Sequence, residues 1–401
     1  MQKRVFDTLP ASPFARLRAL LDGVSPRLAP ISLALGEPQH APPALALQPL
    51  KEKLNDYGRY PPIGGTLDWK AAVRSWLLRR FEVEDVLAED TQILPLNGTR
   101  EGLFLAAQIA PFKDDGLMAM PDPFYQIYAT ATVAAGAQPH YLTATRDSGF
   151  IAPLLDLGAD ELARLRALYL CNPTNPQGAV SDKAYLEKAL ELAQRHNFLL
   201  MVDECYAEIY DPKGMPPPSI LEIMQENNLP NAPVLAFHSL SKRSNLPGLR
   251  SGFVAGGASA MRALSDLRQI AGPQCPTPAQ AAAALAWGED AHVFENRLLY
   301  DEKMTLAGKI FGAAYDFKRP DAGFFLWLNV ADGEAAAQHL WREQGVRVLP
   351  GAYLSALENA PHAAPYIRVA LVADMAQTKP ALSRLKTGLD DFSAKARGSV
   401  A

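Results

Sequence analysis

The residue with the clearest potential for chemistry is Lys242, which stands in the run Ser-Leu-Ser-Lys-Arg-Ser-Asn-Leu-Pro-Gly-Leu-Arg. A strand-like stretch, 234–237, precedes it and an apolar stretch, 249–254, follows it. A lysine on a turn between two buried strands can hold a carbonyl cofactor covalently through its amine. Ser239 and Arg250, at the two ends of the run, could then bind a phosphate group of that cofactor. The alternative is an ordinary charged surface loop.

Polar residues follow strand-like runs elsewhere in the chain as well. Asp203 ends the run Leu-Leu-Met-Val-Asp, where a buried acid is costly unless it is paired. Tyr206 comes shortly afterwards, and Asn175 lies in an Asn-Pro-Gln-Gly segment that could also be a simple rigid turn. Residues 98–100 (Gly-Thr-Arg) precede a helix, where backbone N–H groups favour a phosphate, although the threonine could be a plain N-cap. Because such sheets bind ligands beyond the carboxyl ends of their strands, we expect these residues at one edge.

Strand-like and helical stretches alternate through the middle of the chain, which predicts an α/β fold with a mostly parallel sheet covered on both faces. The expected strands are 93–96, 117–120, 168–170, 199–203, 234–237 and 249–254. The expected helices are 13–21, 66–81, 100–110, 125–135 and a helix capped by Ser181 that runs to residue 196.

The pattern changes after about Pro278 to that of a smaller α+β unit. Helices are expected at 279–287, 290–312, 334–343 and from 375 onward, with strands at 324–329, 346–349 and 367–371. We expect the C-terminal residues from Asp391 onward to fray. The predicted organisation is a large domain, 46–288, a small domain, 289–401, and an N-terminal segment, 1–45, that joins the small domain.

Composition excludes several classes of function. The chain has 401 residues, 48% of them apolar, and a formal charge of -4, which offers no basic field for nucleic acid. No stretch approaches the ~20 apolar residues that span a membrane, and the N-terminus lacks the apolar core of a secretion signal. Three distant cysteines, Cys171, Cys205 and Cys275, have no metal-ligand spacing. They are typical of reduced thiols, and we expect a cytoplasmic protein.

The order of lysine, acid, phenol, amide and phosphate-binding residues resembles the fold-type I pyridoxal-phosphate aminotransferases of class I and II. The resemblance extends from the run Leu-Gly-Glu-Pro at 35–38 to Arg368. The segments 96–101, 123–128 and 237–252 are most similar to the bacterial N-succinyldiaminopimelate aminotransferases.

This resemblance implies a pyridoxal 5′-phosphate cofactor and a role for each candidate residue. Lys242 would bind the cofactor as a Schiff base and then move the proton during the reaction. Asp203 would hold the pyridine nitrogen protonated, while Tyr206 and Asn175 would bind the phenolic oxygen. Burial and the neighbouring cation Arg243 are expected to lower the pKa of the lysine.

Other residues would hold the rest of the cofactor. Tyr125 would stack on the ring, unless it is a core tyrosine, and Tyr60 would reach the phosphate of a neighbouring subunit. The implied assembly is therefore a homodimer with shared active sites. The residues implied to hold the phosphate are Gly98, Thr99, Arg100, Ser239 and Arg250.

The substrates would be amino acids and 2-oxo acids. Arg368 would clamp their α-carboxylate, with Asn175 beside it and Gly36 in a closing loop; the alternative for Arg368 is a surface charge on a strand. The implied reaction is ping-pong transamination between L-glutamate and N-succinyl-2-amino-6-oxopimelate. Arg59, Arg100 and Arg243 are candidates for binding the far end of the substrate.

Three other functions fit parts of the pattern. A C–S lyase or an aminotransferase for another amino acid would share nearly all of these residues. A non-catalytic cofactor-binding regulator would need an added DNA-binding segment, for which there is little room before residue 30. A nicotinamide enzyme would need a Gly-x-Gly-x-x-Gly turn after a strand, and the chain has none.

Overall fold

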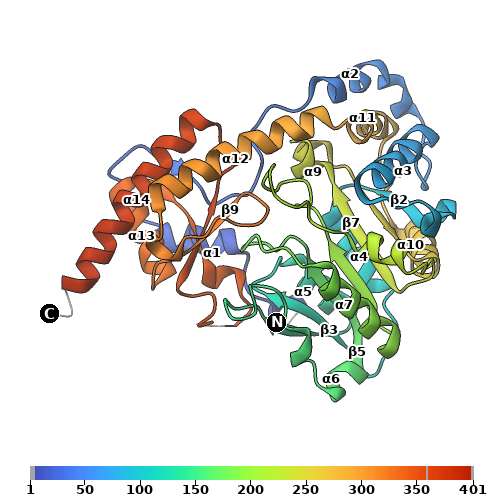
Figure 1. Ribbon diagram of the computed structural model, residues 1–401, viewed down its shortest axis with the longest axis horizontal. Helices are drawn as coiled ribbons and strands as arrows, with labels where there is room; N and C mark the ends of the chain where they lie inside the picture. Colours follow the sequence, from blue (N-terminus) through green and yellow to red (C-terminus); the bar gives the residue numbers. More distant parts are fainter. Residues whose placement is uncertain (1–4, 358–359, 399–401) are drawn as a thin grey trace.

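A seven-stranded sheet in the order β2-β8-β7-β6-β5-β3-β4 forms the centre of the computed structural model, which describes residues 5–357 and 360–398 (Figure 1). Strands β3 to β7 pair in parallel, and β8 lies antiparallel between β7 and β2. The predicted α/β fold with a mostly parallel sheet is therefore confirmed. The strands are β2 (Ile93–Leu96), β3 (Leu117–Asp122), β4 (Gln138–Thr143), β5 (Leu165–Cys171), β6 (Leu199–Asp203), β7 (Val234–Ser239) and β8 (Gly252–Gly256).

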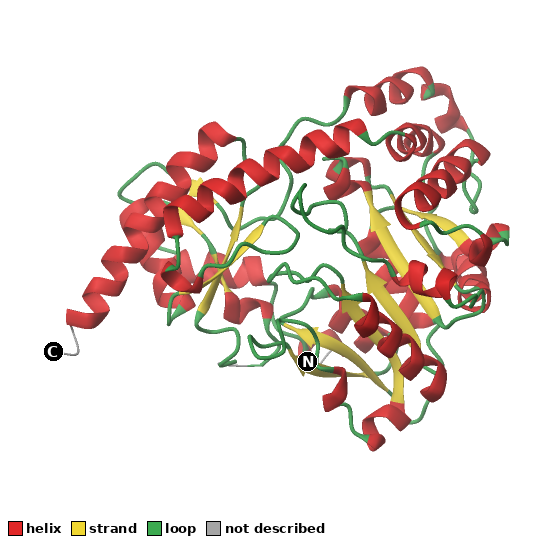
Figure 2. Cartoon of the chain, viewed as in Figure 1, coloured by secondary structure: helices red, strands yellow, loops and turns green. Residues whose placement is uncertain are grey.

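Helices cover both faces of this sheet (Figure 2). Alternate residues of a strand contribute to different cores, since Leu200 and Val202 belong to one apolar cluster and Met201 to the other. The first cluster includes α3 (Leu67–Phe81), α7 (Lys183–His196), α8 (Ile220–Glu226) and α11 (Thr277–Gly288), and the second includes α4 (Thr99–Gln108), α5 (Ile127–Ala134) and α10 (Ala258–Ala271). Every strand of this sheet except the edge strand β4 is thus buried along its whole length.

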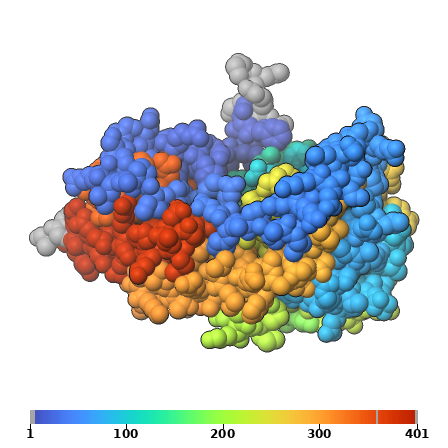
Figure 3. All heavy atoms as spheres, turned by 90° about the horizontal axis from the view of Figure 1, so that it is seen from above, coloured from blue at the N-terminus to red at the C-terminus, as the bar shows by residue number. Residues whose placement is uncertain are grey.

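A smaller α+β unit lies beside the sheet. Its three-stranded sheet has the order β11-β12-β9, and its core includes α12, α13 and α14. Early residues join it, because β1 pairs with β10 and Leu33 belongs to its core; Figure 3 shows blue N-terminal residues against red C-terminal ones. The elements of this unit are α1 (Pro13–Leu21), β1 (Ile31–Ser32), α12 (Ala291–Phe311), β9 (Phe325–Asn329), α13 (Gly333–Gln344), β10 (Val346–Arg347), β11 (Leu349–Pro350), β12 (Tyr366–Ala370) and α14 (Met375–Gly398). Helix α2 (Ala44–Glu52) packs instead against α11, and its Ala46 belongs to the first core of the large sheet.

Three local expectations were wrong. Helix α14 continues to Gly398 instead of fraying from Asp391, because Phe392 packs on the small core and Asp391 pairs with Lys395 at 2.8 Å; residues 399–401 lie outside the described part of the chain. Asp182, not Ser181, caps α7, since its Oδ1 accepts a hydrogen bond from the Tyr185 amide at 2.8 Å. Strand β8 begins only at Gly252, after a 3-10 turn over 247–249.

No helix in the described part of the chain is both long and apolar enough to cross a membrane.

Candidate active site

A cavity of about 450 Å³ lies at the carboxyl ends of the parallel strands, against the small unit. The position is the one expected for ligands of such a sheet. It brings together all of the predicted cofactor and carboxylate-binding residues except Gly98 and Tyr60. The predicted residues that line it are Gly36, Thr99, Arg100, Tyr125, Asn175, Asp203, Tyr206, Ser239, Lys242, Arg250 and Arg368.

Lys242 lies on the short helix α9 (Leu240–Arg243), between β7 and β8, as the sequence predicted. Its Nζ donates a hydrogen bond to the backbone oxygen of Gly36 at 2.6 Å. Burial lowers the pKa of the lysine to about 8, and the cations of Arg368 and Arg250 act in the same direction. The amine is therefore much more easily deprotonated than a lysine in water.

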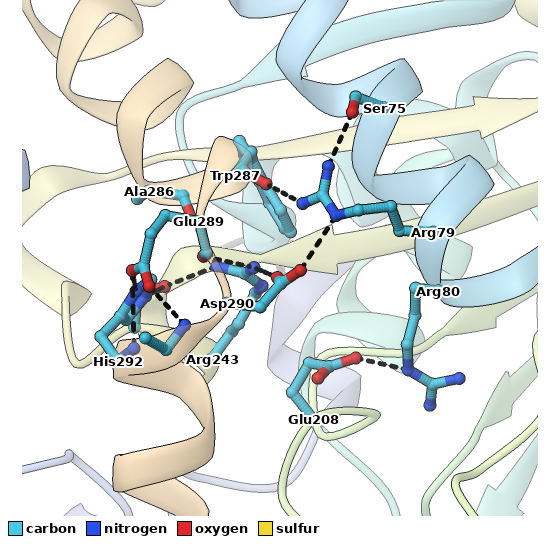
Figure 4. A network of polar contacts seen from close by, with 12 residues as sticks. Ser75, Arg79, Arg80, Glu208, Arg243, Ala286, Trp287, Glu289, Asp290 and His292 are labelled. Atoms are coloured by element: carbon cyan, nitrogen blue, oxygen red, sulfur yellow. Dashed lines mark hydrogen bonds and ion pairs between the residues drawn. The ribbon is translucent and has the colours of Figure 1, made fainter.

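Arg243 does not face the cavity, so the prediction that it could bind the far end of a substrate was wrong. Its buried guanidinium points into a polar network, where it donates to the carboxylate of Asp290 and to the Ala286 carbonyl oxygen, both at 2.6 Å (Figure 4). Arg243 is also not among the main causes of the lowered pKa of Lys242, whereas Arg368 and Arg250 are. Arg243 instead anchors the helix that carries Lys242.

Asp203 ends β6 with its carboxylate buried in the wall of the cavity. Oδ2 accepts a hydrogen bond from the Tyr128 hydroxyl at 2.9 Å, and Oδ1 accepts one from the Cys205 amide at 3.3 Å. Burial raises the pKa of this acid, and these two hydrogen bonds only partly oppose the effect. A cationic N–H group in the cavity would satisfy the carboxylate further.

The other end of the cavity is built to receive an anion. Helix α4 begins there at Thr99, and Gly98 before it has φ +80°. A Cβ on Gly98 would lie 2.1 Å from Nη2 of Arg250, so only glycine lets that guanidinium lie across the start of the helix. Ser239 and Ser241 line the same end. A helix start, a guanidinium and two hydroxyls together suit a phosphate.

Aromatic and amide side chains lie between the two ends. Tyr125 is half-buried, and its hydroxyl accepts a hydrogen bond from Nε of Arg100 at 2.6 Å. Cys205 contacts the Thr99 hydroxyl at 3.0 Å across the cavity wall. Burial raises the pKa of the Tyr206 hydroxyl well above its usual value. At neutral pH these phenols are therefore hydrogen-bond donors, as well as acceptors.

Arg368 is buried on β12 and provides the cationic wall on the side of the small unit. Nη1 donates to Oδ1 of Asn175 at 3.2 Å, and Nη2 donates to the Ala34 carbonyl oxygen at 3.0 Å. Among the described residues its buried Nε finds no hydrogen-bond partner, and the guanidinium stacks on Phe325 at 4.3 Å. Burial lowers the pKa of Arg368 to about 10. These spare donors match a carboxylate.

Sequence reasoning missed several residues of this cavity. No role was predicted for Tyr128, which binds Asp203, or for Ser241, which stands one position before the lysine. Phe325 carried no signal, because an aromatic residue in a strand usually packs in a core. Tyr60 is 96% exposed and lies outside this cavity, and its contact with the phosphate of a neighbouring subunit stays a prediction.

Comparison with known proteins identifies the family. The model of the family "Aminotransferase class I and II" matches residues 29–385. This chain belongs to the class I and II aminotransferases. A curated relative, the LL-diaminopimelate aminotransferase of Desulforudis audaxviator, is 29% identical over 94% of this chain and 95% of the relative. The protein of the same name from Dehalococcoides mccartyi is 31% identical over 88% of this chain and 90% of its own.

Solved structures agree with this assignment. An aminotransferase from Neisseria meningitidis is 34% identical, with a TM-score of 0.89 over 96% of this chain and 99% of that one. The aminotransferase AspB from Helicobacter pylori is 33% identical, with a TM-score of 0.87 over 95% of this chain and 99% of that one. The fold is that of the fold-type I enzymes, and aminotransferases of this family use pyridoxal 5′-phosphate.

The cavity of this aminotransferase fits that cofactor. Asp203 is an acid without a cationic partner among its observed hydrogen bonds, which suits a protonated pyridine nitrogen. Arg250 and the start of α4 form an anion site at the opposite end, which suits the phosphate. Lys242 lines the cavity together with both groups, as attachment of the aldehyde requires.

Proposed function

We propose that this aminotransferase moves an amino group between L-glutamate and the carbon skeleton of diaminopimelate. The observation that supports it most directly is the meeting of Lys242, Asp203, Arg250 and Arg368 in one cavity. The names of the relatives, LL-diaminopimelate aminotransferases, support the choice of the amino substrate. The reaction would run in two half-reactions, with 2-oxoglutarate as the keto acid of the glutamate pair.

Lys242 is the proposed acid–base group. When bound, pyridoxal phosphate supplies a conjugated ring that accepts the electron pair left after a proton leaves the substrate Cα. Nζ of Lys242 would take that proton and return it to the adjoining carbon of the cofactor. Since burial lowers the pKa of this amine to about 8, a useful fraction is neutral near physiological pH.

The proposed roles of the remaining residues follow from their places. Asp203 would keep the pyridine nitrogen protonated, and Tyr128 and the Cys205 amide hold its carboxylate in position. Tyr206 and Asn175 would bind the phenolic oxygen, while Tyr125 would lie against the ring. The proposed phosphate site consists of Gly98, Thr99, Arg100, Ser239 and Arg250.

Arg368 would bind the α-carboxylate of every substrate. Its planar guanidinium has donors to spare, and Asn175 already lies against it at 3.2 Å. The backbone of Gly36 borders the same space, where a Cβ would lie 2.5 Å from Phe325, so glycine is needed there. Both substrates carry this carboxylate, which explains how one cavity can serve both half-reactions.

A second candidate for the amino substrate is N-succinyl-LL-2,6-diaminopimelate. It is supported by the similarity of segments 96–101, 123–128 and 237–252 to the N-succinyldiaminopimelate aminotransferases. Arg100 lines the cavity and stays a candidate for the far end of either substrate, whereas Arg59 is exposed and outside it.

We also propose that the enzyme is a cytoplasmic homodimer. Large exposed side chains gather along residues 54–67, including Tyr57, Tyr60 and Leu67. Such a surface is typical of a region that a second protein covers. The proposed partner surface is a second copy of this chain, whose cavity Tyr60 would reach.

Absorbance and a substrate panel test this proposal. The purified enzyme should be yellow, and L-glutamate should bleach that colour. LL-diaminopimelate, its N-succinyl derivative, ornithine, acetylornithine and aspartate should be compared as donors to 2-oxoglutarate. We expect the highest kcat/KM for LL-diaminopimelate or its derivative; a tenfold preference for another donor would contradict the substrate but not the family.

A substitution of the carboxylate clamp tests the site itself. Arg368→Lys keeps the positive charge but loses the planar guanidinium that can donate two parallel hydrogen bonds to a carboxylate. The KM should therefore rise roughly tenfold or more for glutamate and diaminopimelate alike. Arg347→Lys, an exposed arginine on β10, is the matched control and should change neither KM. An unchanged KM in Arg368→Lys would contradict the assignment of the clamp.

A further inference from the structure

A second cavity, of about 210 Å³, lies beside the first between the large sheet and the small unit. Its size is below the roughly 300–1,000 Å³ of pockets for drug-sized ligands, so it suits a small molecule or one arm of a larger one. Its walls come from the loops at 146–150 and 177–179, the segment 316–321, and three aromatic residues of β9 and β12.

The two cavities share one face of the small sheet. Arg368 pairs directly with Trp327 across β12 and β9, so their side chains project from the same face. Tyr366 and Phe325, two residues away on each strand, project from that face too. Arg368 borders the first cavity, Trp327 and Tyr366 border the second, and Phe325 borders both. One aromatic ring thus separates the second cavity from the clamp.

Two residues that line the second cavity carry buried donors without partners in the described part of the chain. Gln177 is 8% exposed, and its amide Nε2 is buried with no hydrogen-bond partner among the described residues. The same holds for the indole Nε1 of Trp327. Lys318 adds an exposed cation at the rim. Buried N–H groups without acceptors are costly, so this wall is complementary to a ligand that brings oxygen acceptors.

Most of the charged side chains around the cavity are paired with one another or with a neighbouring acid. Arg319 is paired with Asp301 at 2.5 Å, and Arg146 is paired with Asp316 at 2.9 Å, which neutralises that acid. The remaining charges are Lys318 and the exposed Asp321. Lys318 lines the same cavity as Gln177 and Trp327, and the aromatic rings supply an apolar floor for a short carbon chain.

We propose that this second cavity binds an aliphatic carboxylate. The carboxylate would accept hydrogen bonds from Gln177 and Trp327 and face Lys318, while its carbon chain would lie against Tyr366 and Phe325. Two sources carry this chemistry: the far end of a long amino substrate, or a separate small carboxylic acid. Only the first source rests on the proposed function.

Calorimetric titration with succinate tests the proposal on the cofactor-loaded enzyme. Arg368→Met removes the clamp of the first cavity, so the binding that remains reports on the second. We expect saturable binding in this variant, weakened at least tenfold when Gln177→Leu and Lys318→Met are added. The matched control is Lys309→Met, which replaces an exposed lysine of α12 outside both cavities and should leave the affinity for succinate unchanged.

No saturable binding in Arg368→Met, or binding that survives the added substitutions, would overturn the proposal. Because this titration does not require turnover, its failure is distinguishable from failure of the proposed function. Steady-state kinetics of Gln177→Leu/Lys318→Met then identify the source. A raised KM for LL-diaminopimelate with an unchanged KM for glutamate assigns the carboxylate to the substrate; unchanged values for both assign it to a separate acid.

Discussion

At the scale of single residues, burial does more than neighbouring charge to prepare the active-site amine. The pKa of Lys242 falls to about 8 chiefly because its surroundings are poor in water. Arg368 and Arg250 assist, although each is placed for a different anion of the reaction. If Arg368 and Arg250 bind these anions as proposed, the same residues would also lower the pKa of the lysine, so a substitution of either should alter both ligand binding and this pKa.

The rate at which the cofactor attaches to the apoenzyme should report this pKa. Only the neutral amine attacks an aldehyde, so the rate should be constant above pH 8 and fall about tenfold for each unit below it. An ordinary lysine would instead keep gaining rate up to about pH 10.5. Stopped-flow absorbance after mixing apoenzyme with pyridoxal phosphate measures the rate.

Arg368→Met provides the comparison for this profile. Removing this nearby cation should move the midpoint of the pH–rate profile to higher pH, because the protonated amine of Lys242 is then repelled less. A wild-type profile that still rises tenfold per unit above pH 9 would show that burial does not lower the pKa of Lys242.

Most residues of the cavity could be predicted because they are polar and follow the ends of buried strands. At such positions a polar side chain seldom contributes to the apolar core, so a functional role is favoured. Lys242, Asp203 and Asn175 are of this kind. Tyr128 and Phe325 could not be predicted, since their surroundings depend on which strands pair. The direction of Arg243 was also inaccessible, because consecutive residues of the short helix α9 point different ways and nothing local marks which one is buried.

At the scale of elements, α9 is held in place by the junction of α11 and α12. Arg243 on α9 is buried against Trp287 and bound to Asp290 at the start of α12 (Figure 4). Asn296, one turn further along α12, donates to the backbone oxygen of Lys242 at 3.4 Å. The lysine thus derives its position from the helix that runs into the small unit.

Breaking this anchor should destabilise the enzyme. Asp290→Asn leaves the buried Arg243 without its carboxylate, and we expect a loss of about 1–3 kcal/mol in the free energy of unfolding. Arg79→Gln is the matched control, because Arg79 binds the other oxygen of Asp290 at the surface and should cost less than about 1 kcal/mol. Denaturant titrations measure both; equal losses would show that the buried contact has no special weight.

The sequence predicted the elements with strong apolar patterns and missed the weaker ones. Strand β6 has its predicted bounds, because a continuous apolar run ending in an acid is unambiguous. Strand β4 was missed, since it lies at the edge of the sheet and only Leu142 of its residues is buried. Helix α10 was missed although its buried face is regular, because it directly follows the apolar run of β8.

At the scale of the whole molecule, the apolar cores suggest how the chain divides. Two cores use residues between 46 and 287, and another joins Leu33 to residues 304–389. We propose on this basis that the N-terminal segment moves with the small domain. The active-site cavity would then lie between two bodies that can approach each other, with Arg368 on one and Lys242 on the other.

A mixing experiment tests the proposed dimer with shared sites. If Tyr60 acts in the neighbouring site, Tyr60→Ala and Lys242→Ala homodimers are both impaired, but a mixed dimer has one intact site. Reassorting equal amounts should therefore restore about a quarter of wild-type activity at low cofactor concentration. Activity no higher than the mean of the two parents would contradict sharing, and a monomer in sedimentation analysis would contradict the dimer.

The attachment of the cofactor to Lys242 is the claim on which the proposed chemistry depends. Reduction of the yellow enzyme with borohydride, followed by proteolysis and mass spectrometry, would locate the attachment point directly. We predict a single phosphopyridoxyl group on the peptide that contains Lys242, and none in Lys242→Ala. A label on another lysine, or no label on the wild-type chain, would contradict the account.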